Sequence, residues 1–172
     1  MTTRTPPGTM GRRRRRIGTA GWALRGAAAG AAATTALDTV TYLDMAVRGR
    51  PASSTPEDTV TKLAERTGVR IPGEGATRDN RVQGLGALTG LAAGVGIGML
   101  AGLARACGLR LRPLAGTTLT TAAVLVATNG PMTVLGVTDP RTWTVADWIS
   151  DLLPHLAYAA VVTTTLDAFD QG

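Results

Sequence analysis

One stretch of the chain, residues 82–104, contains no charged residue at all. A helix needs about 20 apolar residues to cross the ~30 Å hydrocarbon layer of a bilayer, because each residue advances it by ~1.5 Å. Three further apolar stretches of similar length cover 26–47, 113–137 and 149–169. We therefore expect four membrane-spanning helices, joined by short polar segments.

The composition favours closely packed helices in a membrane over a soluble core. Hydrophobic residues make up 44% of the chain, but aromatic residues make up only 3%, and glycine alone contributes 22 residues. Small residues let helix backbones approach closely in lipid, where no hydrophobic effect drives helices together. The sequence thus predicts an all-α membrane protein, an antiparallel bundle of four transmembrane helices.

The polar segments define the expected domain organisation. Residues 1–25 carry prolines and a run of arginines with little to bury, which predicts a disordered basic tail in the cytoplasm. Residues 26–169 form the membrane domain, and 48–81 form its first, extracytoplasmic loop. Within that loop, Ser54 lies three residues before Glu57 in capping-box order, which predicts a short helix that ends at Gly68.

The arginine run sets the expected orientation and location. Positive residues flanking the first span favour the cytoplasmic side, so we expect a bacterial cytoplasmic (inner) membrane protein with both termini in the cytoplasm. The arginines expected to contact anionic lipid headgroups are Arg12, Arg13, Arg14, Arg15 and Arg16. A twin-arginine export signal, cleaved before about Asp38, is one alternative. A nucleic-acid arm is another, but the stacking aromatics and folded reader of nucleic-acid proteins are missing, so no nucleic-acid partner is expected.

A glycine repeat is the sharpest motif. Five glycines follow each other at intervals of four residues in the second span: Gly86, Gly90, Gly94, Gly98 and Gly102. Repeated GxxxG exposes backbone along one side of a helix, where another helix can pack. The first span carries a similar ridge, with Gly26, Gly30 and Thr34. Either the two ridges face each other within one chain, or the glycine face contacts a second copy or another membrane helix.

Two acids in the first span require partners, because a charge at the centre of a membrane helix costs about 2.5–3.5 kcal/mol. Asp44 has Arg48 one turn away, whereas Asp38 has no such partner in its own helix. Matching residues by depth predicts a polar cluster from all four spans, with Tyr158 on the same helix face as His155. The cluster comprises Asp38, Tyr42, Thr89, Asn129, His155 and Tyr158. It could fix helix register as a polar plug, or titrate in a hydrated pocket.

Signs of enzyme chemistry are missing from the sequence. The chain has one histidine and one cysteine, Cys107, and lacks the Walker A, dinucleotide, HExxH and nucleophile-elbow motifs. No cluster has metal-ligand spacing. We therefore expect no enzyme activity, no cofactor and no metal site.

Three segments together carry a resemblance: YLDMAVRGRP at the end of the first span, STPEDTVTKLAERTG in the loop, and LPHLAYAAV in the last span. They resemble small uncharacterised bacterial, actinobacterial-like inner-membrane proteins with four spans and a His-x-x-Tyr-Ala or His-x-x-Tyr-Gly element near the end. The resemblance covers residues 26–168. It implies the same fold and location, and no activity.

These observations leave three functional hypotheses. The first is a structural or partner-binding membrane module, in contact with the bilayer and with a second copy or another membrane helix. The alternative is a small proton- or solute-transporting protein that uses Asp38 and His155. The third is an intramembrane enzyme, which the lone histidine disfavours.

Overall fold

A computed structural model describes residues 17–171. Residues 1–16 of the predicted basic tail, with Arg12–Arg16, lie outside the described residues. Five α-helices and one short 3-10 helix account for most of the described chain, which contains no strand. They are α1 (Thr19–Arg48), α2 (Thr55–Thr67), α3 (Gly75–Ala106), α4 (Pro113–Leu135), η1 (Pro140–Thr142) and α5 (Val145–Gln171). The prediction of an all-helical fold is confirmed.

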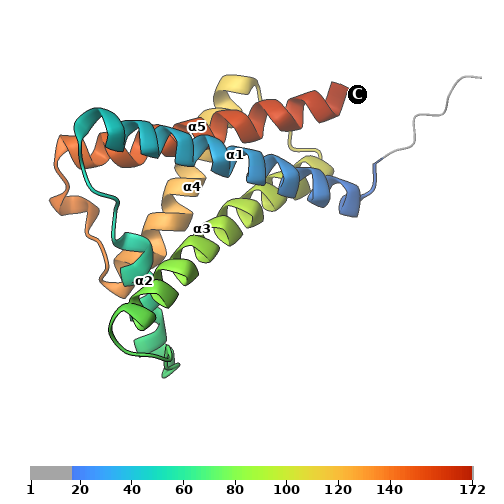
Figure 1. Cartoon of the computed structure of the whole chain (residues 1–172). Coiled ribbons are helices and arrows are strands. Elements are labelled where there is room, and N and C mark those ends of the chain that lie inside the picture. Colours follow the sequence, from blue (N-terminus) through green and yellow to red (C-terminus); the bar gives the residue numbers. More distant parts are fainter. Residues whose placement is uncertain (1–16, 172) are drawn as a thin grey trace, which may run out of the picture.

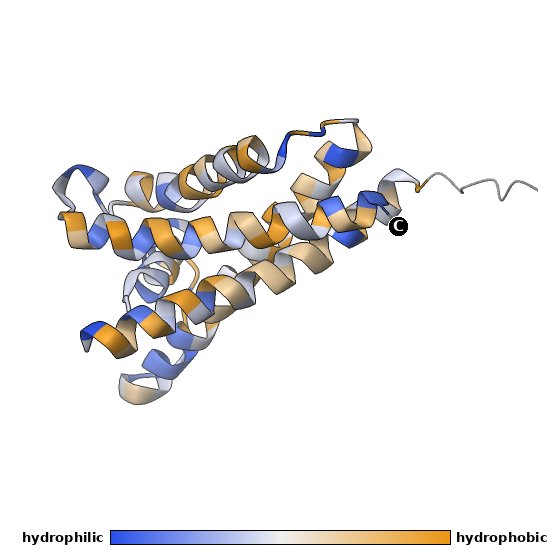
Figure 2. Cartoon of the chain, turned by 90° about the horizontal axis from the view of Figure 1, so that it is seen from above, coloured by the Kyte–Doolittle hydropathy of each residue, from blue (hydrophilic) through white to orange (hydrophobic). Residues whose placement is uncertain are grey.

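Three helices are long and apolar enough to cross a membrane: α3, α4 and α5. The sequence predicted four, and α1 is the one that differs. It has 30 residues, but alanine, glycine and threonine dominate it and are only weakly apolar. Figure 2 shows that the most hydrophilic residues gather mostly toward the helix ends and connections.

The long helix that is not apolar enough by itself to be a candidate span packs against two helices that are. Helix α1 packs between α3 and α5, and α4 packs on the other side of α5 (Figure 1). Ala29 and Ala33 of α1 are completely buried, in the same core as Tyr158, Val162 and Leu166 of α5. Small side chains on α1 are therefore a packing requirement, because larger ones would separate the helices on either side.

The ordered bundle begins earlier than the sequence predicted. We expected a disordered tail up to residue 25, but α1 already begins at Thr19. The reason is Trp22, which is 6% exposed and belongs to the core cluster. Burial of this large side chain ties down a turn of helix that looks polar in the sequence.

The short helix predicted in the first loop is present as α2. It begins at Thr55 and ends at Gly68, which adopts the left-handed conformation with φ 69°. The predicted capping by Ser54 is wrong, because its hydroxyl donates to the Asp58 carboxylate at 2.8 Å and caps no backbone N–H. Val60 is buried, and α2 rests on α3 and α4.

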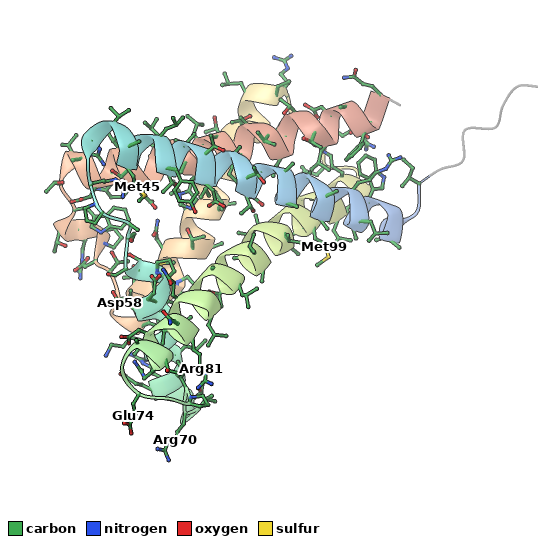
Figure 3. All side chains as sticks on the ribbon, viewed as in Figure 1. Met45, Asp58, Arg70, Glu74, Arg81 and Met99 are labelled. Atoms are coloured by element: carbon green, nitrogen blue, oxygen red, sulfur yellow. The ribbon has the colours of Figure 1, made fainter. Side chains whose placement is uncertain are left out.

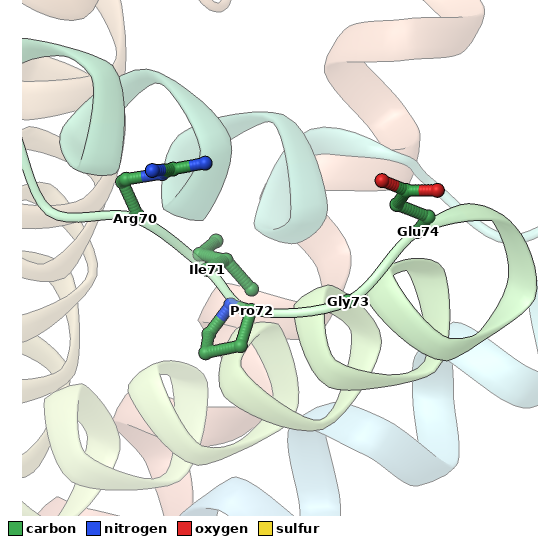
Figure 4. A pocket seen from close by; sticks show the side chains of 5 residues that line it. All are labelled: Arg70, Ile71, Pro72, Gly73 and Glu74. Carbon is green, nitrogen blue, oxygen red and sulfur yellow. The ribbon is translucent and has the colours of Figure 1, made fainter.

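The α2–α3 connection forms a polar tip away from α1 and α5, where Arg70, Glu74 and Arg81 lie (Figure 3). Residues 70–74 of this connection border an open hollow formed by the extended segment itself (Figure 4). A single extended segment offers a ligand no converging side chains, so we assign no binding role to this hollow.

Candidate functional site: glycine contacts and polar clusters

Helices α1 and α3 touch backbone to backbone through the predicted glycines. A Cβ atom built on Gly30 would lie 2.5 Å from the carbonyl oxygen of Gly94, and one on Gly98 would lie 2.5 Å from that of Gly26. Gly102 meets Gly26 and the backbone of Trp22 in the same way. These distances leave no room for any side chain, so the contact requires glycine on both helices. Of the two arrangements left open by the sequence, the contact within one chain is the one present.

The other two glycines of the repeat have different surroundings. A Cβ on Gly86 would meet Pro56 of α2 at 3.2 Å, whereas one on Gly90 would meet nothing within 4 Å. The ridge is thus closed by α1 from Gly94 to Gly102 and by α2 at Gly86. At Gly90 it is open.

The polar residues near the start of α5 form a compact cluster with α4. Asn129 of α4 donates its amide N–H to the Asp151 carboxylate at 2.8 Å. His155 Nδ1 lies 2.7 Å from the Asp151 carbonyl oxygen and 3.4 Å from a carboxylate oxygen of the same residue. The side chains of Asp151 and His155 are only 20% and 13% exposed. Asn129 and His155 therefore do belong to one cluster, and Asp151 joins them.

Tyr158 lies one turn further along α5 and does not join that cluster. It is 1% exposed, and its hydroxyl donates to the Gly94 carbonyl oxygen at 2.6 Å. Apart from this hydrogen bond and the ion pairs that Arg105 makes with Asp167 and Asp170, helices α3 and α5 touch little. This bond therefore links α5 to α3 at the point where α1 packs against the glycine ridge.

The remaining predicted members do not join them. Thr89 is exposed and bonds the Gly86 carbonyl oxygen of its own helix, and Tyr42 is 63% exposed. No hydrogen bond or ion pair within residues 17–171 connects Asp38 to His155. Depth matching placed these residues at similar levels but ignored helix rotation, which turns Thr89 and Tyr42 toward the outside. The six predicted residues therefore do not form one cluster. Asn129 and His155 lie together, whereas Asp38, Tyr42, Thr89 and Tyr158 lie apart from them.

Asp44 lies at the end of α1, where the sequence placed it beside Arg48. Its carboxylate is 2.7 Å from the Arg48 guanidinium and 2.5 Å from that of Arg50. Arg48 also donates to the hydroxyl of Ser150 near the start of α5. This network joins the end of α1 to the beginning of α5.

Sequence reasoning missed a cluster of ion pairs between α3 and α5. Arg105, at the end of α3 and 8% exposed, donates to Asp167 at 2.5 Å and to Asp170 at 2.7 Å. Arg110 pairs with the other oxygen of Asp170 at 2.9 Å. A small cavity of 90 Å³ lies beside Arg105, between α3, α4 and α5. The available signal was the Asp167–Asp170 spacing, which places both acids on one side of the last turns of α5.

An arginine of α1 reaches the same end of α5. Arg25 donates to the carbonyl oxygen of Phe169 at 3.0 Å, and its guanidinium lies over the rings of Trp22 and Phe169, at 5.5 and 5.2 Å from their centroids. The last carbonyls of a helix carry partial negative charge and attract cations. The first turns of α1 are therefore tied to the last turns of α5.

In the connection between α4 and α5, the carboxyl group of Asp139 has a lowered pKa. Hydrogen bonds from the side chain and backbone N–H of Arg141 hold the pKa of Asp139 below its ordinary value. Both residues lie in the α4–α5 connection. Within residues 17–171, no three His, Cys, Asp or Glu side chains are grouped so that they could hold a metal ion.

We predict that Asn129→Ala destabilises the bundle, because the half-buried Asp151 carboxylate loses its donor from α4. The free energy of unfolding should fall by about 1–3 kcal/mol. Thr133→Ala is the matched control on the same helix, since the Thr133 hydroxyl is exposed and bonds only its own helix. Thermal unfolding of both variants in one detergent checks this. Equal stability of Asn129→Ala and Thr133→Ala would contradict it.

No protein family, no curated protein and no solved structure matches this chain. Its function therefore has to be argued from its own residues.

Proposed function

We propose that the protein is a four-span integral membrane protein that serves as a structural or partner-binding module, and not as an enzyme. The fourth span is α1. A helix enclosed by two membrane-spanning helices shares their depth, and its own low hydropathy matters less because protein, rather than lipid, covers much of it. Contacts at both ends support an antiparallel bundle: Arg25 near the start of α1 bonds Phe169, and Arg48 near its end bonds Ser150.

The proposed location is the bacterial cytoplasmic membrane, with both termini in the cytoplasm. At one end of the bundle Trp22 lies beside Arg25 and Arg110, and Arg105 shares Asp170 with Arg110, as expected for the positively charged side. At the other end Trp143 and Trp148 form an edge-to-face pair with centroids 5.0 Å apart, typical of an interface where aromatic rings anchor a helix. In this proposal Arg12–Arg16 bind anionic lipid headgroups. We also propose that the chain shares its fold and location with the four-span bacterial proteins that its sequence resembles.

One observation carries the structural role: two sets of polar and charged groups are bonded between neighbouring helices. Arg105 of α3 is matched by two aspartates of α5, and Asp151 of α5 by Asn129 of α4. Groups that bond each other across helices fix register and orientation, which is the usual role of polar residues between membrane helices. The long apolar faces that remain leave room for a partner.

A transport function is the second candidate, and the Asp151–His155 pair favours it. A carboxylate and an imidazole in contact can exchange a proton, and His155 Nδ1 lies 3.4 Å from a carboxylate oxygen of Asp151. The Asp38–His155 pair expected for transport is not formed. The transport hypothesis therefore relies on Asp151 in place of Asp38.

Flux measurements separate the two candidates. Purified wild-type protein in sealed vesicles should leave the decay of an imposed proton gradient unchanged, as in protein-free vesicles. Gradient collapse that disappears in Asp151→Asn would overturn the structural role in favour of transport. Intact Asp151→Asn protein, verified by its elution volume, is the necessary control.

Labelling with a membrane-impermeant thiol reagent should confirm the orientation. Cys107, exposed in the α3–α4 connection, should react only after the cells are lysed. In a Cys107→Ser background, Ser53→Cys in the first loop should react in intact cells. The opposite pattern would reverse the orientation, and reaction of both sites in intact cells would mean that α3 does not span the membrane.

A further inference from the structure

Two polar side chains lie on the surface of α1 without a partner. Tyr42 is 63% exposed and Asp38 is half-buried, one turn before it. Neither makes a side-chain hydrogen bond to any of residues 17–171. Asp38 is ~20 Å from Arg25 and ~15 Å from Arg48 along the helix, so its short side chain cannot reach either end of a spanning α1.

Other polar residues on this surface are already satisfied. Thr35 donates to the Ala31 carbonyl oxygen at 3.3 Å, and Thr39 donates to that of Thr35 at 2.7 Å. The unsatisfied groups are thus one strong acceptor, the Asp38 carboxylate, and one donor, the Tyr42 hydroxyl. Lipid offers the Asp38 carboxylate no bond, so the arrangement is costly for a lone chain in a bilayer.

Within residues 17–171, no other element covers the side of α1 on which Ala31, Thr35, Tyr42 and Ala46 are exposed. Thr34 is the last residue of α1 packed into the glycine ridge, where it meets Gly94, and the next glycine, Gly90, contacts nothing. Four of the five glycines that suggested a contact between copies, all but Gly90, are used inside the chain. The exposed side of α1 is a different surface, which a second molecule can contact.

We propose that α1 pairs with α1 of a second copy, and that Tyr42 of each chain donates its hydroxyl to the partner's Asp38. This inference rests on the proposed partner-binding role and names the partner. The chain itself supplies donor and acceptor, one turn apart on one side of the helix. A two-fold axis along the membrane normal would form the bond twice.

The surface around the pair suits a close helix contact. Ala31, Thr35 and Ala46 are exposed small residues on the same side of α1 as Asp38 and Tyr42. Small side chains let two backbones approach closely enough for side-chain hydrogen bonds to form across the interface.

The test uses the full chain with Cys107→Ser, reconstituted into phosphatidylcholine–phosphatidylglycerol vesicles at varied protein-to-lipid ratios. Ala46→Cys should form a disulfide-linked homodimer on oxidation, whereas Val126→Cys, 72% exposed on α4, should not. Energy transfer between labelled chains then gives the dimer affinity. Tyr42→Phe, which removes one oxygen atom, should weaken it about tenfold.

Several variants separate a dimer contact from a folding effect. Tyr42→Phe should leave the thermal unfolding of the monomer in detergent unchanged, because the hydroxyl bonds nothing within the described chain. Asp38→Ala should weaken the dimer as much as Tyr42→Phe, and the double variant should be no weaker than either single one.

Three results would overturn the dimer: monomers at every protein-to-lipid ratio, wild-type affinity in Tyr42→Phe, or crosslinking of Ala46→Cys in native membranes to a different protein only. The last would leave the partner-binding role intact. Proton flux through the wild type would overturn that role instead, whatever the dimer affinity.

Discussion

Gly98→Ala should detach α1 from α3 and unfold the protein at a markedly lower temperature. The added Cβ would lie 2.5 Å from the Gly26 carbonyl oxygen and would also meet the Gly30 backbone. The atoms in the way belong to backbone, so no side-chain rotation relieves the clash and the helices must move apart. Overpacking at such a site costs about 3 kcal/mol, which thermal or denaturant unfolding in detergent would detect.

Two glycines of the same helix provide controls. A Cβ on Gly90 or Gly96 would meet nothing within 4 Å. Alanine is a better helix former than glycine by up to ~1 kcal/mol, so Gly90→Ala and Gly96→Ala should be neutral or mildly stabilising. If all three variants unfolded at the same temperature, the backbone contact between α1 and α3 would not exist in the membrane.

Arg105→Met should lower the stability of the protein to a comparable extent, because it breaks the ion pairs between α3 and α5. It removes the guanidinium that bonds both Asp167 and Asp170, and leaves Asp167 without an ionic partner. Stranding one half of a buried ion pair costs about 3–5 kcal/mol. Arg105→Lys should lose part of that stability, because an ammonium cannot present the same fork to two carboxylates. Unfolding in one detergent compares the variants.

A second substitution tests the cause. Asp167→Asn in the Arg105→Met background removes the stranded charge and should recover part of the lost stability. Arg141→Leu is the control for losing any arginine, since its side chain is 88% exposed and pairs only with Asp139 in a connecting segment. A drop in Arg141→Leu as large as that in Arg105→Met would show that the ion-pair cluster has no special role.

Most of the helical organisation could be predicted from local sequence. The uncharged run 82–104 indicates a membrane helix by length and hydropathy alone, and GxxxG spacing indicates the side of α3 that another helix contacts. Asp44 and Arg48 were predictable as a pair, because residues four apart on a helix always face each other. Each of these relations lies within one helix.

Relations between helices were harder to predict. Depth counting put Asp38 level with His155, yet helix rotation separates them and brings Asn129 to Asp151. The partners of Arg105 are more than sixty residues away in the chain. Pairing over such a distance depends on which faces meet, and this sequence contains no periodic signal for that.

The sequence by itself determined where the long helices run, where α2 ends, and that glycines would line a close contact. These features follow from hydropathy, from helix period and from the conformations open to glycine, all of which act within a few residues. Only the tertiary structure decided that α1, the long helix that is not apolar enough by itself to be a candidate span, packs between α3 and α5. Its small residues are weakly apolar individually, but they allow two neighbouring helices to approach at once, and that benefit arises only when the helices are packed together.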